Sequence, residues 1–427
     1  MEGWNEISLQ DLTSYVIGGD WGNNPEELIN DSTLAFCIRG SEIKEWRKNK
    51  GKTAVIRRIK QSSLDNRKLE KGNILIEISG GGPEQPVGRV LYIDEESLNT
   101  EGNLPLVCTN FFRKLQLVDS VCSKYVYYYL HYFYLNGNTI SLQGGSNNLR
   151  NLKYKDYQMT KIPLPSYTEQ KQIAEKLDKL FDQIESIKKS TERIPELLKN
   201  FRQQILTYAV TGKLTEDWRK EKLLDEWRVE LAKDCCEKVQ SGGTPKGSKF
   251  ETVGIPFLKV YNIVNNKIDF ESEPQYVSEE IQNSQIKKSI TYPGDVIMNI
   301  VGPPLNKVAI IPDTYKEWNL NQAITLFRPK EYLNNKYLYY FFCEGSSVNS
   351  VIDKTRGVVG QVNISLSQCR DFSISIPPME EQLEIVKRIE SLFNILDDAE
   401  RRYQLLRDKL DKLPQTLLCK AFKGELI

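Results

Sequence analysis

The sequence predicts a mixed α/β (α+β) protein in which two globular domains are separated by two long helices that form an antiparallel coiled coil. Two observations favour this fold class. A segment occurs twice in the 427-residue chain, and an internal repeat of this kind indicates a repeated structural unit. Each copy also carries apolar residues in alternating steps of three and four, which is the pattern of a coiled-coil seam. We therefore expect a pseudo-twofold internal repeat.

The repeat is clearest in the stretch EQKQIAEKLDKLF from Glu169, which returns as EQLEIVKRIESLF from Glu381, 212 residues later. Residues 162–215 and 374–427 align at this offset without a gap and share 13 of 54 positions, whereas chance gives roughly three. Further upstream the offset grows to 222, so insertions separate the first parts of the two halves. The repeat predicts globular domains at 1–160 and 226–372 and helical regions at 161–225 and 373–427.

Both globular segments contain short β-rich runs broken by glycine and proline. NILIEI and RVLYI lie in the first segment, and VIMNI and KVAII lie in the second. Helical patches fall between these runs, and such alternation is typical of mixed domains. We expect two α/β heads of related construction.

The helical regions each carry one apolar stripe, which predicts a heptad seam. In the first copy the seam residues are Ile173, Leu177, Leu180, Ile184, Ile187, Leu198 and Ile205. In the second copy they are Ile385, Ile389, Leu392, Leu396, Leu406, Leu410 and Leu417. Pro195 lies within the first seam and is expected to interrupt it.

A seam of about 35 residues gives a helix roughly 50 Å long, and such a helix needs a partner for its apolar stripe. The two helical copies can pack against each other, so that each buries the apolar stripe of the other. A globular domain lies between them, so the chain must leave the first helix and return, which favours antiparallel pairing. Two similar helices paired in this way create an approximate twofold axis.

Composition limits the possible functions. The formal net charge is +1 and hydrophobic residues make up 40%, as in ordinary soluble proteins. No apolar run is long enough for a membrane span, and we expect a cytoplasmic protein. The eight cysteines form no CxxC pair, and the only histidine, His131, lies in the aromatic stretch YVYYYLHYFYL. These counts predict no metal site.

The known catalytic motifs are missing. GGTPKGSK (242–249) lacks the Gly-Lys-Ser/Thr of a phosphate loop. ISGGGPEQPVG (78–88) lacks the glycine spacing of a dinucleotide site, and both segments are more simply explained as tight loops. VGPPL (301–305) lacks the Asn or Asp and the aromatic residue that flank the prolines of an amino-methyltransferase site. We therefore predict no catalytic residues in this chain.

Two heads on a paired helix are suited to measuring a distance, and duplex DNA offers half-sites at fixed separations. A basic strip in the first head, between Lys44 and Lys60, could contact phosphates, and loops rich in Asn, Gln and Arg could contact base edges. A solvated surface and ordinary turns remain alternatives for each position. The candidate DNA-binding residues are Lys52, Arg57, Arg58, Lys60, Asn147, Asn148, Arg150, Lys153, Lys246, Lys249, Asn319, Asn321, Gln322, Lys354, Arg356, Gln361 and Asn363.

Several longer motifs resemble those of the specificity (S, or HsdS) subunit of type I restriction-modification systems. They include ISGGGPEQPVGRVLYI in the first head and PGDVIMNIVGPPLNKVAIIP in the second. The helical regions add IPLPSYTEQKQIAEKLDKLF and RIPELLKNFRQQILTYAVTGKLTEDWR. The resemblance covers nearly the whole chain.

The resemblance implies two target-recognition domains that each read half of a bipartite DNA sequence, with helical regions that fix the gap. It also implies two modification (HsdM) subunits that use S-adenosylmethionine for DNA methylation, and restriction (HsdR) subunits that use ATP and Mg²⁺. This chain would bind no cofactor and would direct the chemistry without performing it. The alternative is a coiled-coil scaffold whose two heads bind proteins, which predicts no DNA binding.

Overall fold

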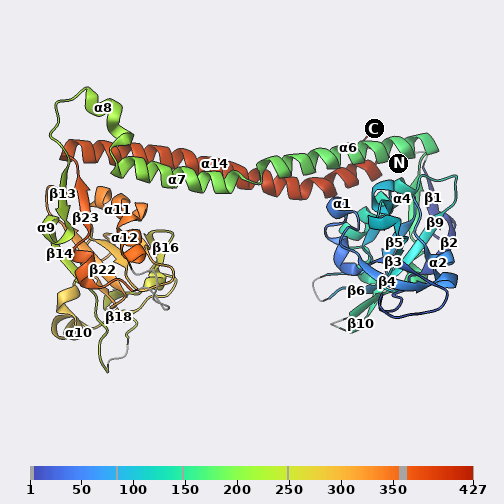
Figure 1. The fold of residues 1–427 in the computed structure, drawn as a ribbon, viewed down its shortest axis with the longest axis horizontal. Coiled ribbons are helices and arrows are strands. Elements are labelled where there is room, and N and C mark those ends of the chain that lie inside the picture. The colour runs from blue at the N-terminus through green and yellow to red at the C-terminus, as the bar shows by residue number, and fades with distance from the viewer. Residues whose placement is uncertain (1–3, 83–84, 147–148, 248–249, 355–362, 427) are drawn as a thin grey trace. The chain divides into compact units, whose positions relative to one another are not determined.

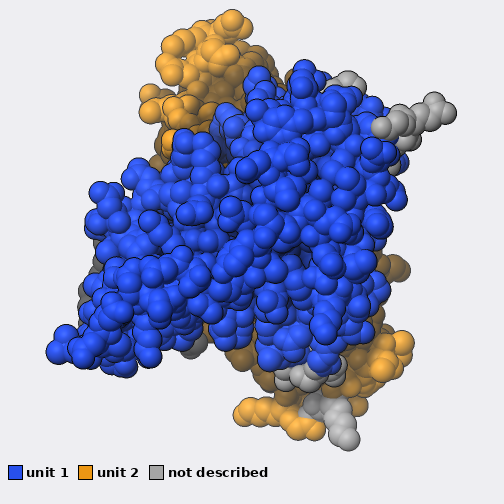
Figure 2. All heavy atoms as spheres, turned by 90° about the vertical axis from the view of Figure 1, so that its right-hand side faces the viewer, with its two compact units in different colours: residues 1–191, 405–427 blue, residues 192–404 orange. Residues whose placement is uncertain are grey.

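The computed structural model describes residues 4–82, 85–146, 149–247, 250–354 and 363–426. The chain divides into two compact units, shown in different colours in Figure 2. The first unit contains residues 1–191 and 405–427, and the second contains residues 192–404. One helix, α14 (Met379–Phe422), contributes to both units.

The first unit is built on a four-stranded antiparallel sheet and a three-stranded sheet. The first sheet has the order β2-β9-β5-β7, and the second has the order β4-β3-β8 with β3 and β8 parallel. The central strand β5 is buried along its whole length, as its apolar sequence predicts. The strands are β2 (Thr13–Gly18), β9 (Phe112–Leu117), β5 (Ile74–Glu77), β7 (Val90–Tyr92), β4 (Val55–Lys60), β3 (Ser32–Ile38) and β8 (Leu106–Cys108).

Smaller sheets and helices complete this unit. β1 pairs with β12, and β6 joins the hairpin of β10 and β11. These strands are β1 (Asn5–Ser8), β12 (Lys161–Leu164), β6 (Ser79–Gly80), β10 (Gln143–Ser146) and β11 (Leu149–Leu152). The helices are α1 (Trp46–Asn49), α2 (Gln61–Arg67), α3 (Glu95–Leu98), α4 (Ser123–Leu135), α5 (Tyr154–Tyr157) and α6 (Tyr167–Thr191).

The second unit repeats the topology of the two main sheets. Its sheets have the orders β14-β22-β19-β20 and β18-β15-β21, again with one parallel pair, β15 and β21. β13 pairs with β23 as β1 pairs with β12, and β16 pairs with β17. The strands are β14 (Cys236–Ser241), β22 (Ile324–Pro329), β19 (Val296–Asn299), β20 (Val308–Ile310), β18 (Tyr276–Val277), β15 (Ile255–Leu258), β21 (Asn319–Leu320), β13 (Arg228–Leu231), β23 (Ser373–Ile376), β16 (Ile263–Val264) and β17 (Lys267–Ile268).

The helices of the second unit also follow the first. The aromatic helix α11 corresponds to α4, and each of the two lies between the long helices and the main sheet of its own unit (Figure 1). The helices are α7 (Ile194–Val210), α8 (Glu216–Lys220), α9 (Ala232–Cys235), α10 (Glu279–Ser284), α11 (Asn335–Glu344), α12 (Ser346–Lys354), α13 (Leu366–Arg370) and the first part of α14. The predicted mixed α/β architecture with an internal repeat is confirmed.

The long helices pair in antiparallel fashion inside each unit. In the first unit Lys188 pairs with Asp411 at 2.8 Å and Lys176 Nζ donates to Leu426 O at 2.6 Å. In the second unit Arg202 pairs with Glu400 at 3.2 Å, and Arg388 Nη1 donates to Leu214 O at 2.9 Å. In both units residue numbers rise along one partner as they fall along the other, which confirms the expected direction.

The predicted seam residues differ in burial. Those that are buried are Ile173, Leu177, Ile184, Leu198, Ile385, Ile389 and Leu410. Those that are partly buried are Leu180, Ile205, Leu392, Leu396 and Leu417, whereas Ile187 and Leu406 are exposed. Pro195 stands at the start of α7, so the first copy is divided into α6 and α7 while the second copy continues through Pro414. Among the described residues no helix is long and apolar enough to cross a membrane.

Candidate nucleic-acid interface

The first candidate reading loop is the hairpin of β10 and β11. Gly145 has a φ of +115°, and a Cβ atom there would lie 2.5 Å from the carbonyl oxygen of Leu149, so the hairpin requires glycine at this position. Arg150 is partly buried and Lys153 is exposed at the end of the hairpin. The candidates Asn147 and Asn148 lie outside the described residues.

The described residues of the glycine-rich segment 78–88 lie directly against this hairpin. Asn151 of β11 is opposite Ser79 of β6, and Arg150 is opposite Gly80. The backbone N–H of Val87 also donates to Gln143 Oε1 at 3.2 Å. Two segments that the sequence presents separately therefore form one surface.

A buried ion pair holds the base of the glycine-rich segment. The Glu77 carboxylate is only 2% exposed and accepts two hydrogen bonds from Arg89, at 2.8 Å from Nε and 2.5 Å from Nη2. The Gln85 amide oxygen also accepts a hydrogen bond from Arg89 Nη1, at 2.7 Å. A charge-assisted pair of this kind is directional, so it fixes the strand ends from which the loop extends.

The second unit contains the same contact. Val301, which follows β19, forms an isolated antiparallel bridge with Asn363. The buried side chain of Asn299 shapes the adjoining loop: its amide donates to Val301 O at 3.1 Å and to Pro304 O at 2.8 Å, and its oxygen accepts from the N–H of Lys307 at 2.7 Å.

The two bridges are equivalent under the repeat. Asn363 follows Asn151 by 212 residues, and Val301 follows Ser79 by 222, which are the two offsets found in the sequence. The contact between the two segments was not predicted, because it pairs residues far apart in the chain. Of the other candidates in this part of the second unit, Arg356, Gln361 and the side chain of Lys354 lie outside the described residues.

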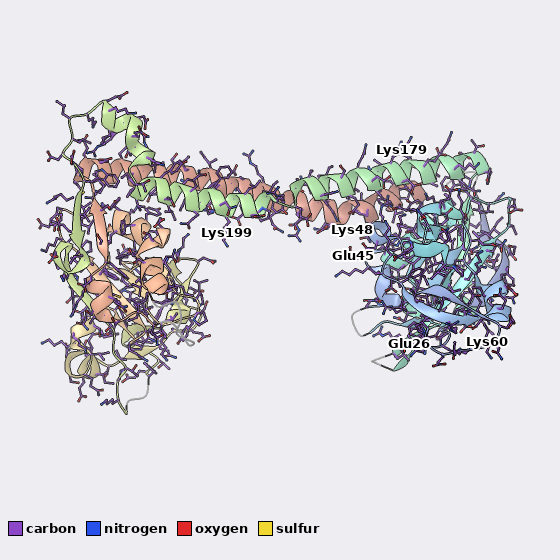
Figure 3. The ribbon with its side chains drawn as sticks, viewed as in Figure 1. Glu26, Glu45, Lys48, Lys60, Lys179 and Lys199 are labelled. Atoms are coloured by element: carbon purple, nitrogen blue, oxygen red, sulfur yellow. The ribbon has the colours of Figure 1, made fainter. Side chains whose placement is uncertain are left out.

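The predicted basic strip does not form one continuous patch. Arg47 pairs with Asp182 at 2.6 Å and lies over the ring of Phe181 at 5.1 Å, so it holds α6 to the head. Lys50 pairs with Asp94. Figure 3 shows Lys48 next to the long helices and Lys60 at the far end of the same head. Lys52 and Lys60 are exposed, and within the described ranges neither has an ion pair.

Arg57 and Arg58 hold a neighbouring loop. Arg57 Nε donates to Trp21 O at 3.0 Å, and its guanidinium lies 4.3 Å from the centre of the Trp21 ring. Arg58 Nη2 donates to Pro25 O at 2.8 Å. Both side chains are partly buried, so the loop is fixed and the Trp21–Arg57 pair remains at the surface.

In the second unit the candidate amides have different environments. Asn319 is fully buried. Its Oδ1 accepts a hydrogen bond from the Ser289 hydroxyl at 2.8 Å, and its Nδ2 donates to Gln282 Oε1 at 3.2 Å. This side chain is therefore not available to a base. Gln322 is exposed and accepts a hydrogen bond from Thr244. Asn321 is partly buried, and its side-chain oxygen has no hydrogen-bond partner among the residues that the structure describes.

The loop of Thr244 and the loop of Gln322 pack closely. A Cβ atom at Gly242 would lie 2.0 Å from the carbonyl oxygen of Asn321, so only glycine permits this approach. Lys246 is exposed on the same loop, and its backbone N–H donates to Gln285 Oε1 at 2.8 Å. Lys249 lies outside the described residues. The two loops bring Lys246 and Gln322 to one face of the second head.

Comparison with known proteins identifies the family. The family model for the type I restriction modification DNA specificity domain matches residues 1–196 and 225–406. The chain belongs to this family. It is the DNA specificity subunit of a type I restriction-modification system and a non-catalytic component of the complex.

The similarity to known specificity subunits covers the whole chain. The chain is 27% identical to the type I restriction enzyme EcoKI specificity subunit of Escherichia coli (strain K12), across 100% of this chain and 89% of the relative. It is 26% identical to the StySPI specificity subunit of Salmonella potsdam, again across 100% and 89%. The crystal structure of the HsdS subunit from Thermoanaerobacter tengcongensis aligns with a TM-score of 0.67 at 17% identity, across 100% and 98%, which supports the same fold.

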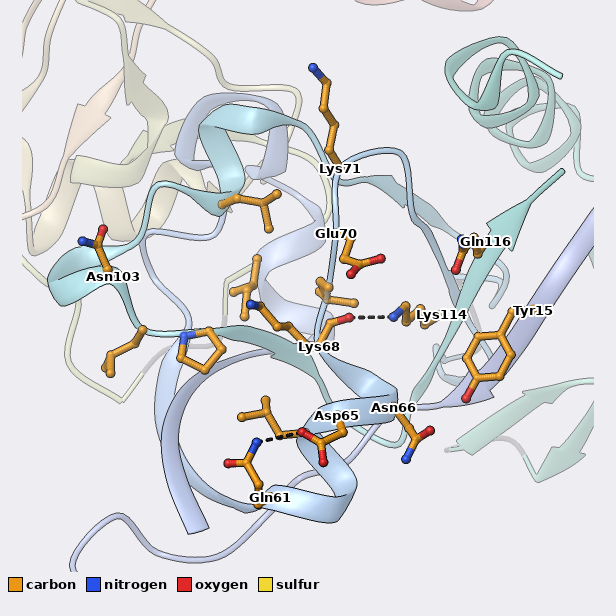
Figure 4. Close-up of a pocket in the computed structure, with 16 residues that line it drawn as sticks. Tyr15, Gln61, Asp65, Asn66, Lys68, Glu70, Lys71, Asn103, Lys114 and Gln116 are labelled. Carbon is orange, nitrogen blue, oxygen red and sulfur yellow. Dashed lines mark hydrogen bonds between the residues drawn. The ribbon is translucent and has the colours of Figure 1, made fainter. Parts of the chain in front are cut away.

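A polar cavity in the first head of the specificity subunit has mixed charge. It has a volume of about 860 Å³ and lies between α2 and the ends of β8 and β9 (Figure 4). Inside it Lys114 Nζ donates to Lys68 O at 2.6 Å, and burial lowers the pKa of Lys114. Asp65 and Glu70 line the same space. Acidic and basic groups both line it, so it offers no uniformly basic surface for a phosphate backbone.

Proposed function

We propose that each head reads one half of a bipartite duplex DNA target and that the paired helices set the spacer between the halves. On this proposal residues 1–160 and 226–372 are the target-recognition domains. The two helical regions, 161–225 and 373–427, are the spacer. Such a protein acts on DNA in the cytoplasm.

The observation that carries this proposal is the repeated topology with different surface residues. Each head joins two segments that are distant in the chain through an equivalent bridge, Ser79 with Asn151 in the first head and Val301 with Asn363 in the second. The position that Ser79 takes in the first head is taken by Val301 in the second, and Arg150 lies beside the bridge in the first head. One scaffold with two different surfaces is what a reader of two unlike half-sites requires. The other candidate residues remain proposed contacts to DNA, except Asn319, which is buried.

The outer faces of the long helices support a second part of the proposal, the docking of two modification (HsdM) subunits and of restriction (HsdR) subunits. Phe201 is 52% exposed, Leu197 45% and Ile395 62% in the second unit, and Leu405 is 55% exposed in the first. Apolar side chains on an outer helix face favour a protein partner. S-adenosylmethionine, ATP and Mg²⁺ are proposed to be bound by those partners.

Methylome sequencing tests the proposed function. A host that expresses the chain with its modification subunits should methylate adenines within a motif of two specified halves and one unspecified spacer of constant length. A host that expresses the modification subunits alone should lack this methylation. A motif without two halves, or methylation that does not depend on the chain, would reject the proposal and favour a protein-binding scaffold.

A further inference from the structure

A buried glutamine ties the first head to the start of α6. Gln170 is 3% exposed. Its Oε1 accepts from the backbone N–H of Cys122, the residue before α4, at 3.0 Å, and its Nε2 donates to Pro165 O at 2.9 Å. One amide thus connects the long helix, the start of the aromatic helix of the head and the residue that follows β12.

The second head has the same arrangement. Gln382 is fully buried near the start of α14. Its Oε1 accepts from the N–H of Asn334 at 2.7 Å, and its Nε2 donates to Pro377 O at 2.8 Å and to Tyr332 O at 2.9 Å. Gln382, Asn334 and Pro377 each lie 212 positions after Gln170, Cys122 and Pro165.

Two further contacts repeat at this offset. Tyr125 OH donates to Pro163 O at 2.6 Å, and Tyr337 OH donates to Ser375 O at 2.6 Å. An ion pair then joins the aromatic helix to the next turn of the long helix. These pairs are Lys124–Asp178 at 2.6 Å and Lys336–Glu390 at 2.7 Å.

These polar contacts restrict rotation in a way that the surrounding apolar packing does not. Ile173 and Leu177 of α6 share a core cluster with residues of α4, and Ile385 and Ile389 of α14 share one with residues of α11. Apolar contact is non-directional and tolerates sliding. A hydrogen bond weakens steeply as its angle departs from linear, so the buried amide sets the angle between head and helix.

We infer that Gln170 and Gln382 are positioning residues that fix the angle of each head on its helix and thereby restrict the target to one spacer length. This inference rests on the proposed function. Moving a half-site by one base pair shifts it by about 3.4 Å along the duplex and turns it by about 35° around the axis. A head that can rotate on its helix follows that turn, whereas a head held by the glutamine does not.

The test compares Gln170→Leu with Gln172→Leu in the full-length chain with its modification subunits. Gln172 is an exposed glutamine on the same helix, so its substitution controls for the change of residue type. A second variant, Asp178→Asn, weakens the Lys124 contact at a partly exposed position and remains informative if Gln170→Leu does not fold. Methylome sequencing gives the motif and spacer length for each.

The expected result is that Gln170→Leu and Asp178→Asn keep both half-sites but also methylate sites with a spacer one base pair longer or shorter. The preference for the native spacer should fall by about tenfold, which corresponds to about 1.4 kcal/mol. Gln172→Leu should keep the native spacer. If the folded variants keep a single spacer, or lose the first half-site without any change in spacing, the inference is wrong. A wild-type chain without a bipartite motif would instead reject the proposed function.

Discussion

His131 is the only histidine of the chain and packs within the aromatic helix α4. Its ring stacks on Tyr127 with 6.1 Å between centroids. Burial and the nearby Arg47 lower the pKa of His131 from 6.5 to about 4. The folded protein therefore holds this ring neutral, and its environment opposes protonation.

The first prediction concerns the pH dependence of stability. Because the folded pKa of His131 is below the unfolded value, the unfolded chain binds more protons between pH 6.5 and 4. The stabilising contribution is complete above pH 6.5 and is lost as the pH falls towards 4. Between pH 7 and pH 5 the loss should be at most about 2 kcal/mol. Urea unfolding of wild type and His131→Phe at both pH values checks this, and equal losses in the two proteins would contradict it.

The second prediction concerns Arg150, which stands opposite Gly80 where the hairpin meets the glycine-rich segment. If Arg150 contacts a base, Arg150→Ala should weaken specific binding by about 1–3 kcal/mol and relax the first half of the motif only. Lys179→Ala is the matched control, because Lys179 is a cation on the surface of α6 in the same unit (Figure 3). Gel-shift titration against targets with each half altered measures the effect. If Arg150→Ala binds with wild-type affinity and selectivity, Arg150 does not contact a base.

At the scale of the elements, the long helices could be predicted because their pattern is local. Steps of three and four place the seam on one face, and Pro195 marks the interruption between α6 and α7. The last turns of α14 differ from the simple pattern. Leu418 and Phe422 are buried there, whereas Lys420 is exposed. The Phe422 ring packs against the aromatic helix α4, and this contact turns Phe422 towards the head. A heptad pattern in the sequence does not predict such a contact.

The heads were less predictable because their strands pair across long stretches of chain. The runs NILIEI and VIMNI are the central strands β5 and β19, but nothing in their sequence specifies the neighbours. The candidate site shows the same limit. The glycine-rich segment looked like a tight loop in isolation, and only the pairing of Ser79 with Asn151 brings it to the hairpin.

The third prediction concerns the outer face of α7. Phe201 is 52% exposed, so Phe201→Ser should change the free energy of unfolding by less than about 0.5 kcal/mol. If this face docks a modification subunit, the same change should weaken that association by more than about 1 kcal/mol, as removal of a central aromatic side chain does. Co-purification and calorimetric titration measure it. Lys199→Ser, at an exposed position of the same helix, is the control, and equal binding by both variants would contradict the docking face.

For the whole molecule, the repeat relates two heads of the same construction. The four-stranded sheet and the mixed three-stranded sheet have the same strand order in both units, and both units join head to helix through equivalent glutamines. The residues by which each head contacts its long helix belong to the head itself. Tyr337 and Lys336 of the second head take the places of Tyr125 and Lys124 of the first. The second head should therefore fit the helix of the first.

The fourth prediction follows from this fit. A chain in which residues 227–372 replace residues 4–160 carries the second head twice, and Gln170 and Asp178 of α6 remain to hold the new copy. If the internal repeat relates the two heads by a twofold axis, two identical heads present identical surfaces to the two half-sites in opposite orientations. The methylated motif should then become an inverted repeat of the second half-site, with the native spacer. Methylome sequencing distinguishes the outcomes. A direct repeat would show that the axis does not relate the reading surfaces, and an unchanged first half would show that residues 4–160 do not read it.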